Sequence, residues 1–405
     1  MTLILLSSER FATFWTRKGF NAMRHENSVL HQILKHIPWS AFERLVEEQR
    51  SDKHVRRLTT KSQLIALLYG QLSGAQSLRE IEAGLKSHEA KIYHLGAEPA
   101  RRSTLADANA LRPSAVFADL FATLVGLAHR GLRRKTRDAI RLIDSSGLRL
   151  SSLSQSWAKF SNGVYGAKLH VIYDPDADCP LYFATSAANV NDITEAKTMP
   201  IQKGATYVFD LGYYDYGWWA KLDAANCRII TRLKRNTPLH DVNERHVPKR
   251  QTTILGDRTG RLPAKMTYRN KNPFQKRVRE IMVRTPTGKI LRIASNDLKS
   301  SARKIADLYK RRWQVELFFR WVKQTLKIRR FLGTSENAIR IQIAAALIAF
   351  LLLRMAQICQ RTIKSPLAFA RLVRTNLLHR RPLDRLLAPF PPLIRNPDQL
   401  ALALT

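Results

Sequence analysis

Acidic residues are scarce in this 405-residue chain, where 32 Asp and Glu stand against 68 Lys and Arg and leave a formal net charge of +36. A surplus of that size favours association with a polyanion, such as a nucleic acid or an anionic membrane surface. Disorder does not explain the charge, because 45% of the residues are hydrophobic and seven are Trp. The composition therefore predicts a folded protein with one large core or two to three domains, and a negatively charged partner.

Cysteine is also scarce. The three cysteines, Cys179, Cys227 and Cys359, are far apart in the sequence and include no Cys-x-x-Cys pair. This pattern excludes a disulfide framework and a cysteine-rich zinc site, and it fits a reducing cytoplasm.

Long apolar runs are missing as well. Residues Leu3–Leu6 are too few for a secretory signal, and the run Ile343–Leu353 has eleven residues, whereas a membrane-spanning helix needs about 20. We therefore expect no membrane partner. The chain also lacks a Gly-x-x-x-x-Gly-Lys-Ser/Thr phosphate loop, which excludes nucleotide hydrolysis of that type.

The N-terminal third has a helical pattern. Residues 1–22 show little pattern and precede a second methionine, Met23, so they are a possible extension before an alternative start. From there to about Arg112 apolar residues recur with the helical period, and Ser77 with Glu80 has the spacing of a capping box at a helix start. Short helices joined by glycine turns are typical both of a DNA-binding helix-turn-helix module and of a plain helical bundle, and the sequence leaves both interpretations open.

The middle of the chain changes to the period of β-strands. Strands are expected at Ala139–Ile143, Lys168–Tyr173, Leu181–Thr185, Thr206–Phe209 and Arg228–Leu233. Helical segments fall between the third and fourth strands and between the fourth and fifth. The order strand, strand, strand, helix, strand, helix, strand predicts an α/β fold.

Two segments follow this region. Residues 245–292 carry fourteen Lys or Arg against two acids and contain several turn signals, so we expect a β-rich basic insertion at 236–298. Residues beyond 300 are strongly helical, with one long helix expected to run to about Ile328 and an apolar core helix from Ala338 to Cys359. A basic, proline-punctuated tail ends the chain.

Two aspartates follow apolar runs and are the first candidates for chemistry. Asp144 follows the strand expected at Ala139–Ile143, and Asp210 follows the one at Thr206–Phe209. If these strands are neighbours in one sheet, both carboxylates emerge near the same edge, where paired carboxylates hold Mg²⁺. Alternatively, each aspartate only caps a strand or a helix.

A third acid lies on the helix expected at 304–328. Tyr309, Arg312, Glu316 and Lys323 are spaced by three, four and seven residues, which places them along one helix face. Four large apolar residues are expected to anchor this helix on the sheet: Trp313, Leu317, Phe318 and Trp321. The alternative is a solvated charged face, on which Glu316 pairs with Arg320 four residues later.

At these positions the sequence resembles the Asp-Asp-Glu transposases of the insertion-sequence-four family. Tyr309-x2-Arg312-x3-Glu316-x6-Lys323 matches their Tyr-Arg-Glu-Lys signature. The surroundings of Asp144 and Asp210 resemble the family's first two acidic motifs. The similarity covers roughly residues 25–360 and includes further short segments: 103–109, Lys168-Leu169-His170 and Ala188–Asp192.

The resemblance implies an α/β fold with an RNase H-like catalytic core, a β-rich insertion and a preceding helical domain. It implies that Asp144, Asp210 and Glu316 bind two Mg²⁺ ions, for which Mn²⁺ can substitute, and catalyse DNA cleavage and strand transfer. It further implies contacts to double-stranded DNA by the signature residues and the neighbouring Arg320: Tyr309, Arg312, Arg320 and Lys323. A homodimer on paired transposon ends, acting in the bacterial cytoplasm at the nucleoid, is the expected assembly.

The implied domains are an N-terminal helical, DNA-binding domain at 23–135, a core at 136–335 and a C-terminal helical region with a basic tail at 336–405. Two other functions stay open: a catalytically inactive DNA-binding protein of the same fold, and a nuclease that only hydrolyses. Hairpin-forming relatives stack a flipped base on a Trp of the insertion, which this insertion lacks, so Tyr268 or Phe274 would have to take that role.

Overall fold

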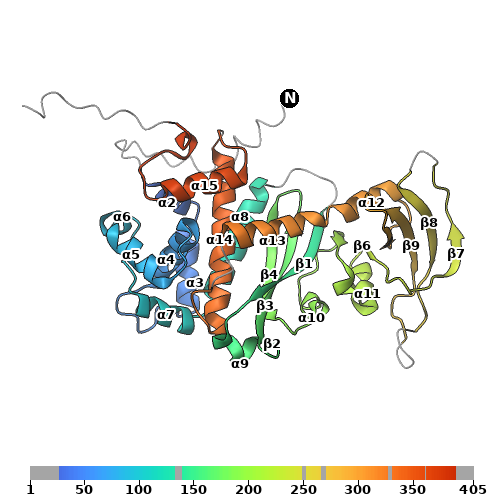
Figure 1. Cartoon of the computed structure of the whole chain (residues 1–405), viewed down its shortest axis with the longest axis horizontal. Helices are drawn as coiled ribbons and strands as arrows, with labels where there is room; N and C mark the ends of the chain where they lie inside the picture. The colour runs from blue at the N-terminus through green and yellow to red at the C-terminus, as the bar shows by residue number, and fades with distance from the viewer. Residues whose placement is uncertain are drawn as a thin grey trace, which may run out of the picture.

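The computed structural model describes residues 27–132, 139–248, 252–265, 271–326, 331–360 and 362–388. It is a mixed α/β structure, with a helical part beside a large β-sheet (Figure 1). Residues 1–22, Met23 and Tyr268, which the sequence analysis singled out, lie outside the described ranges.

The N-terminal part is helical, as predicted. Its described helices are α2 (Val29–Leu34), α3 (Trp39–Glu48), α4 (Thr60–Ser73), α5 (Leu78–Ser87), α6 (Glu89–Tyr93), α7 (Arg102–Leu111) and α8 (Ala115–Leu132). Ser77 caps α5 as its spacing predicts, because its hydroxyl accepts a hydrogen bond from the Glu80 N–H at 3.2 Å. The Glu80 carboxylate in turn accepts one from the Gln76 N–H at 2.9 Å.

Ten strands form the sheet in the order β2-β3-β1-β5-β6-β10-β9-β8-β7, and β4 pairs with β3 outside this path. The strands are β1 (Ile140–Arg149), β2 (Lys159–Ser161), β3 (Val164–Asp174), β4 (Cys179–Ala187), β5 (Thr206–Val208), β6 (Arg228–Arg232), β7 (His240–Glu244), β8 (Ile254–Arg261), β9 (Arg277–Arg284) and β10 (Ile290–Ser295). Strands β1, β5 and β6 are parallel, whereas β3 and β4 run antiparallel to their neighbours.

Short helices complete the sheet region. They are η1 (Ser152–Ser154), α9 (Gln155–Ala158), α10 (Asp192–Ala196), η2 (Leu211–Tyr213) and α11 (Tyr216–Ala224). The predicted order of three strands, helix, strand, helix and strand corresponds to β1, β3, β4, α10, β5, α11 and β6. Strands β7–β10 lie in the basic segment, where β10 pairs with β6, so this segment continues the main sheet.

The two faces of the sheet belong to different hydrophobic clusters. Leu142 and Val208 pack into the cluster that includes the helical part, whereas Ile143 and Phe209 pack into a second one with Trp218 and other residues of α11. Neighbouring residues of a strand point to opposite faces, which produces this division. The sheet therefore lies between two helical layers.

The helix predicted as one piece over 304–328 is two helices. They are α12 (Ala302–Lys310) and α13 (Trp313–Thr325), separated by Arg311 and Arg312. Both arginines keep helical dihedral angles, but the backbone hydrogen bonds tighten at the break, where the Arg312 N–H donates to the Tyr309 carbonyl at 3.0 Å and the Gln314 N–H to the Arg311 carbonyl at 2.9 Å. Both arginine side chains are bound to the sheet region. Arg311 donates to Asp176 at 2.5 Å and Arg312 donates to Asp144 at 3.2 Å. Helix α13 contacts β1, and α12 lies farther along the sheet, over β6 and β8–β10.

The C-terminal helices pack against the N-terminal ones. They are α14 (Glu336–Cys359), α15 (Pro366–Asn376) and η3 (Leu383–Arg385). Helix α14 stands between the N-terminal helices and the sheet and contacts α2, α4, α7 and α8 (Figure 1). By length and composition α14 is apolar enough to cross a membrane, but 89% of its most apolar window is buried in this fold. The helical part is thus built from both ends of the chain.

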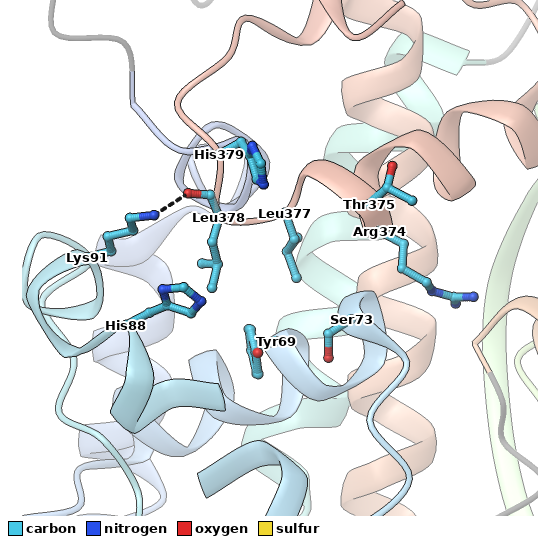
Figure 2. A pocket seen from close by; sticks show the side chains of 9 residues that line it. All are labelled: Tyr69, Ser73, His88, Lys91, Arg374, Thr375, Leu377, Leu378 and His379. Carbon is cyan, nitrogen blue, oxygen red and sulfur yellow. Dashed lines mark hydrogen bonds between the residues drawn. The ribbon is translucent and has the colours of Figure 1, made fainter. Parts of the chain in front are cut away.

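A cavity of about 220 Å³ lies where α15 meets the N-terminal helices (Figure 2). The residues that line it are Tyr69, Ser73, His88, Lys91, Arg374, Thr375, Leu377, Leu378 and His379. Lys91 crosses from α6 and donates to the Leu378 carbonyl at 3.0 Å. Because this lining contains no carboxylate, the cavity is distinct from the acidic residues considered next.

Candidate active site

Asp144 and Asp210 occupy equivalent positions beside two paired, parallel strands. Leu142 of β1 pairs with Val208 of β5, and each aspartate follows two residues later. Both aspartates therefore share a sheet face with Leu142 and Val208, the face that α13 covers. The prediction required β1 and β5 to be neighbours in one sheet, and this pairing is confirmed. Asp144 is not at the strand end, however, because β1 pairs with β3 as far as Arg149.

Arg312 forms hydrogen bonds to both Asp144 and Glu316 and so connects the two acids. The Arg312 guanidinium donates to Asp144 Oδ2 at 3.2 Å through Nη1 and to Glu316 Oε1 at 2.5 Å through Nη2. The exposed fractions of the Arg312, Asp144 and Glu316 side chains are 14%, 15% and 34%. Glu316 thus pairs with Arg312, four residues before it, and not with Arg320. The structure brings together three of the sequence-predicted residues in one partly buried cluster.

Asp210 belongs to the same electrostatic cluster. The pKa of Asp144 is raised to about 7, chiefly by burial and also by the charges of Asp210 and Glu316, although the Ser145 N–H and Arg312 act to lower it. Burial would lower the pKa of Arg312, but Tyr309, Glu316 and Asp144 raise it. The Asp210 carboxylate accepts a hydrogen bond from the Gly212 N–H at 2.8 Å. The cluster therefore holds negative charge that one guanidinium partly compensates.

The other three candidates surround this cluster in different ways. Tyr309 is only 8% exposed and lies close enough to Arg312 to raise the pKa of that arginine. Lys323 donates to the Gly147 carbonyl of β1 at 2.7 Å. Arg320 is exposed on α13. Only Arg320 and Lys323 are therefore placed at the surface for a contact with a large ligand.

The expected anchoring of α13 on the sheet is correct for Phe318, which is buried and packs against Tyr173 of β3 with ring centroids 5.1 Å apart. Trp321 packs edge-on against Phe350 of helix α14 instead, with ring centroids 5.0 Å apart. Trp313 and Leu317 are exposed at 61% and 48%, because α13 buries the side that faces β1 and α14 and these two residues lie on the other side.

Phe274 does not offer a stacking platform for a base. It is 3% exposed and packs edge-on against Trp219, with ring centroids 6.4 Å apart. The alternative that placed a flipped base on Phe274 is therefore wrong for this conformation. The burial follows from the position of Phe274 in the second hydrophobic cluster, beneath α11.

Comparison with known proteins identifies this arrangement. Residues 135–352, which contain Asp144, Asp210 and Glu316, match the family described as the transposase DDE domain. The chain belongs to the DDE transposase family. The transposase is thus a metal-dependent enzyme that cleaves and transfers DNA strands. Residues 25–98 match a separate domain of unknown function.

Two relatives cover most of the chain. The Sinorhizobium fredii protein y4zB, named as a transposase, is 43% identical over 290 residues, which are 71% of this chain and 80% of that protein. A Geobacillus stearothermophilus protein, named as the transposase of insertion sequence element IS5377, is 29% identical over 67% of this chain and 72% of its own. A chain of a piggyBac transposase synaptic complex with hairpin DNA aligns with 93% of this chain and 84% of that one, at 11% identity and a TM-score of 0.42.

The acidic side chains of the transposase have the donor chemistry that suits the divalent cation implied by its family, although they are not arranged to hold it in this conformation. Asp144, Asp210 and Glu316 offer carboxylate oxygens, the donors that Mg²⁺ and Mn²⁺ prefer. Arg312 already occupies the space between Asp144 and Glu316 as a cation. Among the described residues no three His, Cys, Asp or Glu side chains are close enough to hold a metal ion. Direct binding by all three acids therefore requires Arg312 to move and the carboxylates to close up.

The raised pKa of Asp144 gives a testable pH dependence. Its pKa is about 7 in the folded protein, against 3.8 for the ordinary group, so the folded state binds this proton more tightly than the unfolded chain does. The resulting stabilisation is present at low pH and is lost as the pH rises to 7. We expect Asp144→Asn to lose less stability than the wild type between about pH 5 and about pH 8 in urea unfolding. Parallel pH profiles of the two proteins would contradict the assignment.

The sequence analysis missed a fourth acid beside this cluster. Asp192, the first residue of α10, lies across Gly212 from Asp210. It was noticed only as part of the Ala188–Asp192 segment. The sequence did contain a hint of its role, since Asp192 is an acid between two strands of a chain poor in acids. Its distance to Asp210, however, depends on how α10 and η2 pack, which no sequence pattern shows.

Proposed function

We propose that the sheet around the acids is an RNase H-like catalytic core. Three antiparallel strands (β4, β3 and β1) followed by two parallel ones (β5 and β6) support this assignment, with α11 connecting β5 to β6. In this proposal the core spans 136–335, and 236–298 is its basic β-rich insertion. The helical domain at 23–135 and the C-terminal region at 336–405 flank it.

We propose that Asp144, Asp210 and Glu316 are the catalytic residues and hold two Mg²⁺ ions, or Mn²⁺ in their place. When bound, such ions activate the attacking oxygen and stabilise the leaving oxygen of a phosphodiester. The observation that carries this proposal is the placement of Asp144 and Asp210 at equivalent positions on one sheet face, with Glu316 joined to Asp144 through Arg312.

The basic residues are proposed to hold the DNA backbone beside the acids. When Arg312 leaves Asp144 and Glu316, its guanidinium is in place to bind a phosphate with two parallel hydrogen bonds, and Tyr309 lies beside it. Lys323 and the exposed Arg320 add phosphate contacts along α13. These contacts position a strand without reading its sequence.

The assembly extends beyond the catalytic residues. We propose that the N-terminal helices bind double-stranded DNA at the terminal inverted repeats, and that a homodimer holds two ends together. The net charge of +36 supports a large DNA footprint. The proposed location is the bacterial cytoplasm, at the nucleoid.

An assay of cleavage and joining tests this function. Linear DNA that carries the inverted repeats flanking the coding region is incubated with the protein, Mg²⁺ and a target plasmid. A transposase releases the ends and joins them to the target. A nuclease that only hydrolyses gives cut ends without joined products, and an inactive DNA-binding protein gives neither, so each alternative has its own result.

A substitution of Arg320 tests whether the DNA backbone lies along α13. We expect Arg320→Gln to weaken binding to all sequences alike and to make the slope of log affinity against log salt shallower by about 1, as the loss of one phosphate contact does. Fluorescence anisotropy with labelled end DNA at several salt concentrations measures this. The control is Arg340→Gln on α14, whose arginine pairs with Glu336 at 2.5 Å. An unchanged slope in Arg320→Gln would remove Arg320 from the interface.

A further inference from the structure

Asp192 is held in place by a lysine from the sheet. Lys168 of β3 donates to Asp192 Oδ1 at 3.0 Å and to the Val190 carbonyl at 2.8 Å, which fixes the start of α10. Lys168 stands opposite Gly147 of β1 in the sheet register, three residues beyond Asp144. The Asp192 side chain is 23% exposed. The lysine therefore binds only the Oδ1 oxygen of Asp192, and the Oδ2 oxygen does not bond to it.

The second oxygen of Asp192 faces Asp210 across a glycine. A Cβ atom added to Gly212 would lie 3.1 Å from Asp192 Oδ2 and 3.1 Å from Asp210 Oδ1. Because both oxygens lie 3.1 Å from that one point, they can be no farther from each other than the sum of the two distances. The space between them is open because residue 212 is a glycine and has no side chain to fill it. Burial raises the pKa of Tyr213 well above its usual range, and Asp144, Asp192 and Asp210 each raise it further. One phenol therefore lies within electrostatic reach of all three aspartates.

A buried histidine lies beside Asp192. His170 of β3 is 0% exposed, and its Nε2 shares a hydrogen bond of 2.8 Å with the Ser186 hydroxyl. Its Nδ1 has no hydrogen-bond partner and lies 4.0 Å from Asp192 Oδ1. The fold thus leaves an unsatisfied polar atom near a carboxylate that pairs with Lys168 at 3.0 Å. Such an arrangement suits a group that completes its contacts with water or an ion.

We propose that Asp192 is a positioning residue of the metal centre, whose Oδ2 accepts hydrogen bonds from water molecules bound to a divalent cation at Asp210. This inference rests on the proposed function of Asp144, Asp210 and Glu316. Mg²⁺ keeps several of its water molecules when it binds to proteins, so a carboxylate just beyond the direct ligands stabilises it through them. Loss of such an outer partner costs about 10- to 100-fold in metal affinity.

The test measures Mn²⁺ binding to the full chain without DNA, by the electron paramagnetic resonance signal of free Mn²⁺. We expect Asp192→Asn to weaken binding about tenfold or more. The matched control is Asp215→Asn, since Asp215 also pairs with a lysine, Lys197 at 2.8 Å, and is 21% exposed, close to the value for Asp192. Asp215 caps α11 through the Trp218 N–H, so this control also loses a helix cap. Wild-type affinity in Asp192→Asn would overturn the proposal.

Two further variants separate positioning from a purely structural role. Lys168→Met keeps the Asp192 charge and removes its anchor, so it should weaken Mn²⁺ binding less than Asp192→Asn does. Equal losses would show that Asp192 acts only by holding Lys168. Asp210→Asn tests the underlying site, because unchanged binding in that variant contradicts the proposed function itself. Gly212→Ala, with its methyl group between two carboxylate oxygens, should also weaken binding.

Discussion

Glu316→Gln is expected to abolish DNA cleavage and joining while the protein still binds the terminal repeats. The change removes one negative charge and keeps the shape of the side chain. Metal ions at such sites supply several kcal/mol of transition-state stabilisation, and each ~1.4 kcal/mol is a factor of ten in rate. We therefore expect losses of about a thousandfold or more for Glu316→Gln, Asp144→Asn and Asp210→Asn. Gel assays of cleaved and joined products, with parallel binding by anisotropy, measure both effects.

A glutamate with the same local pairing is the control for this experiment. Glu336 accepts from Arg340 at 2.5 Å, as Glu316 accepts from Arg312 at 2.5 Å, and both pairs span four residues of a helix. Glu336 lies at the start of α14, away from Asp144. Glu336→Gln should retain wild-type activity. If Glu316→Gln is as active as Glu336→Gln, Glu316 has no catalytic role.

Arg279→Met is expected to destabilise the outer part of the sheet by about 3–5 kcal/mol, the usual cost of leaving one member of a buried ion pair alone. Arg279 is 2% exposed and donates to both oxygens of Asp257, at 2.8 Å and 2.6 Å. Asp257 is itself buried, so its charge would lose its best partner. Native-state hydrogen exchange of the β8 and β9 amides measures the loss locally.

Two other variants give the matched comparison. Arg261→Met removes an arginine of β8 whose pair with Asp241 is 3.8 Å long and exposed at both ends. We expect that change to cost less than about 1 kcal/mol. The double variant Arg279→Met with Asp257→Leu removes both buried charges and should recover much of the loss. A loss in Arg279→Met no greater than in Arg261→Met would contradict this account.

The ion pair at Arg279 also affects the helices next to Arg312 and Glu316. Arg279 donates to the Ser300 carbonyl, and the next residue, Ser301, caps α12 by accepting from the Lys304 N–H at 3.2 Å. Helix α12 leads directly to Arg312 and α13. We therefore expect Arg279→Met to reduce DNA cleavage as well, although Arg279 belongs to the part of the sheet beyond β6 and bonds to Asp257 and Ser300, not to Asp144, Asp210 or Glu316.

The three acids proposed to be catalytic could be chosen from the sequence because acids are rare in this chain. Asp144 and Asp210 follow apolar runs. Glu316 lies in the Tyr-Arg-Glu-Lys signature, and Arg312 and Glu316 of that signature remain in contact despite the unexpected helix break at Arg311 and Arg312. Asp144 and Asp210 lie close together because β1 pairs with β5, and the sequence does not reveal that pairing. The period of a strand indicates which face a residue takes, but not which strand lies beside it.

The basic charge and the predicted order of core strands and helices were determined by the sequence alone, because composition and period are local properties. The sequence also singled out Asp144, Asp210 and Glu316 as candidates, through their resemblance to family motifs. Only the tertiary structure decided that Arg312 bridges Asp144 and Glu316, that Phe274 is buried, and that Asp192 faces Asp210 across Gly212. The physical reason is common to all three. Each contact joins segments brought together by sheet pairing and helix packing, and no local pattern records the distance between them.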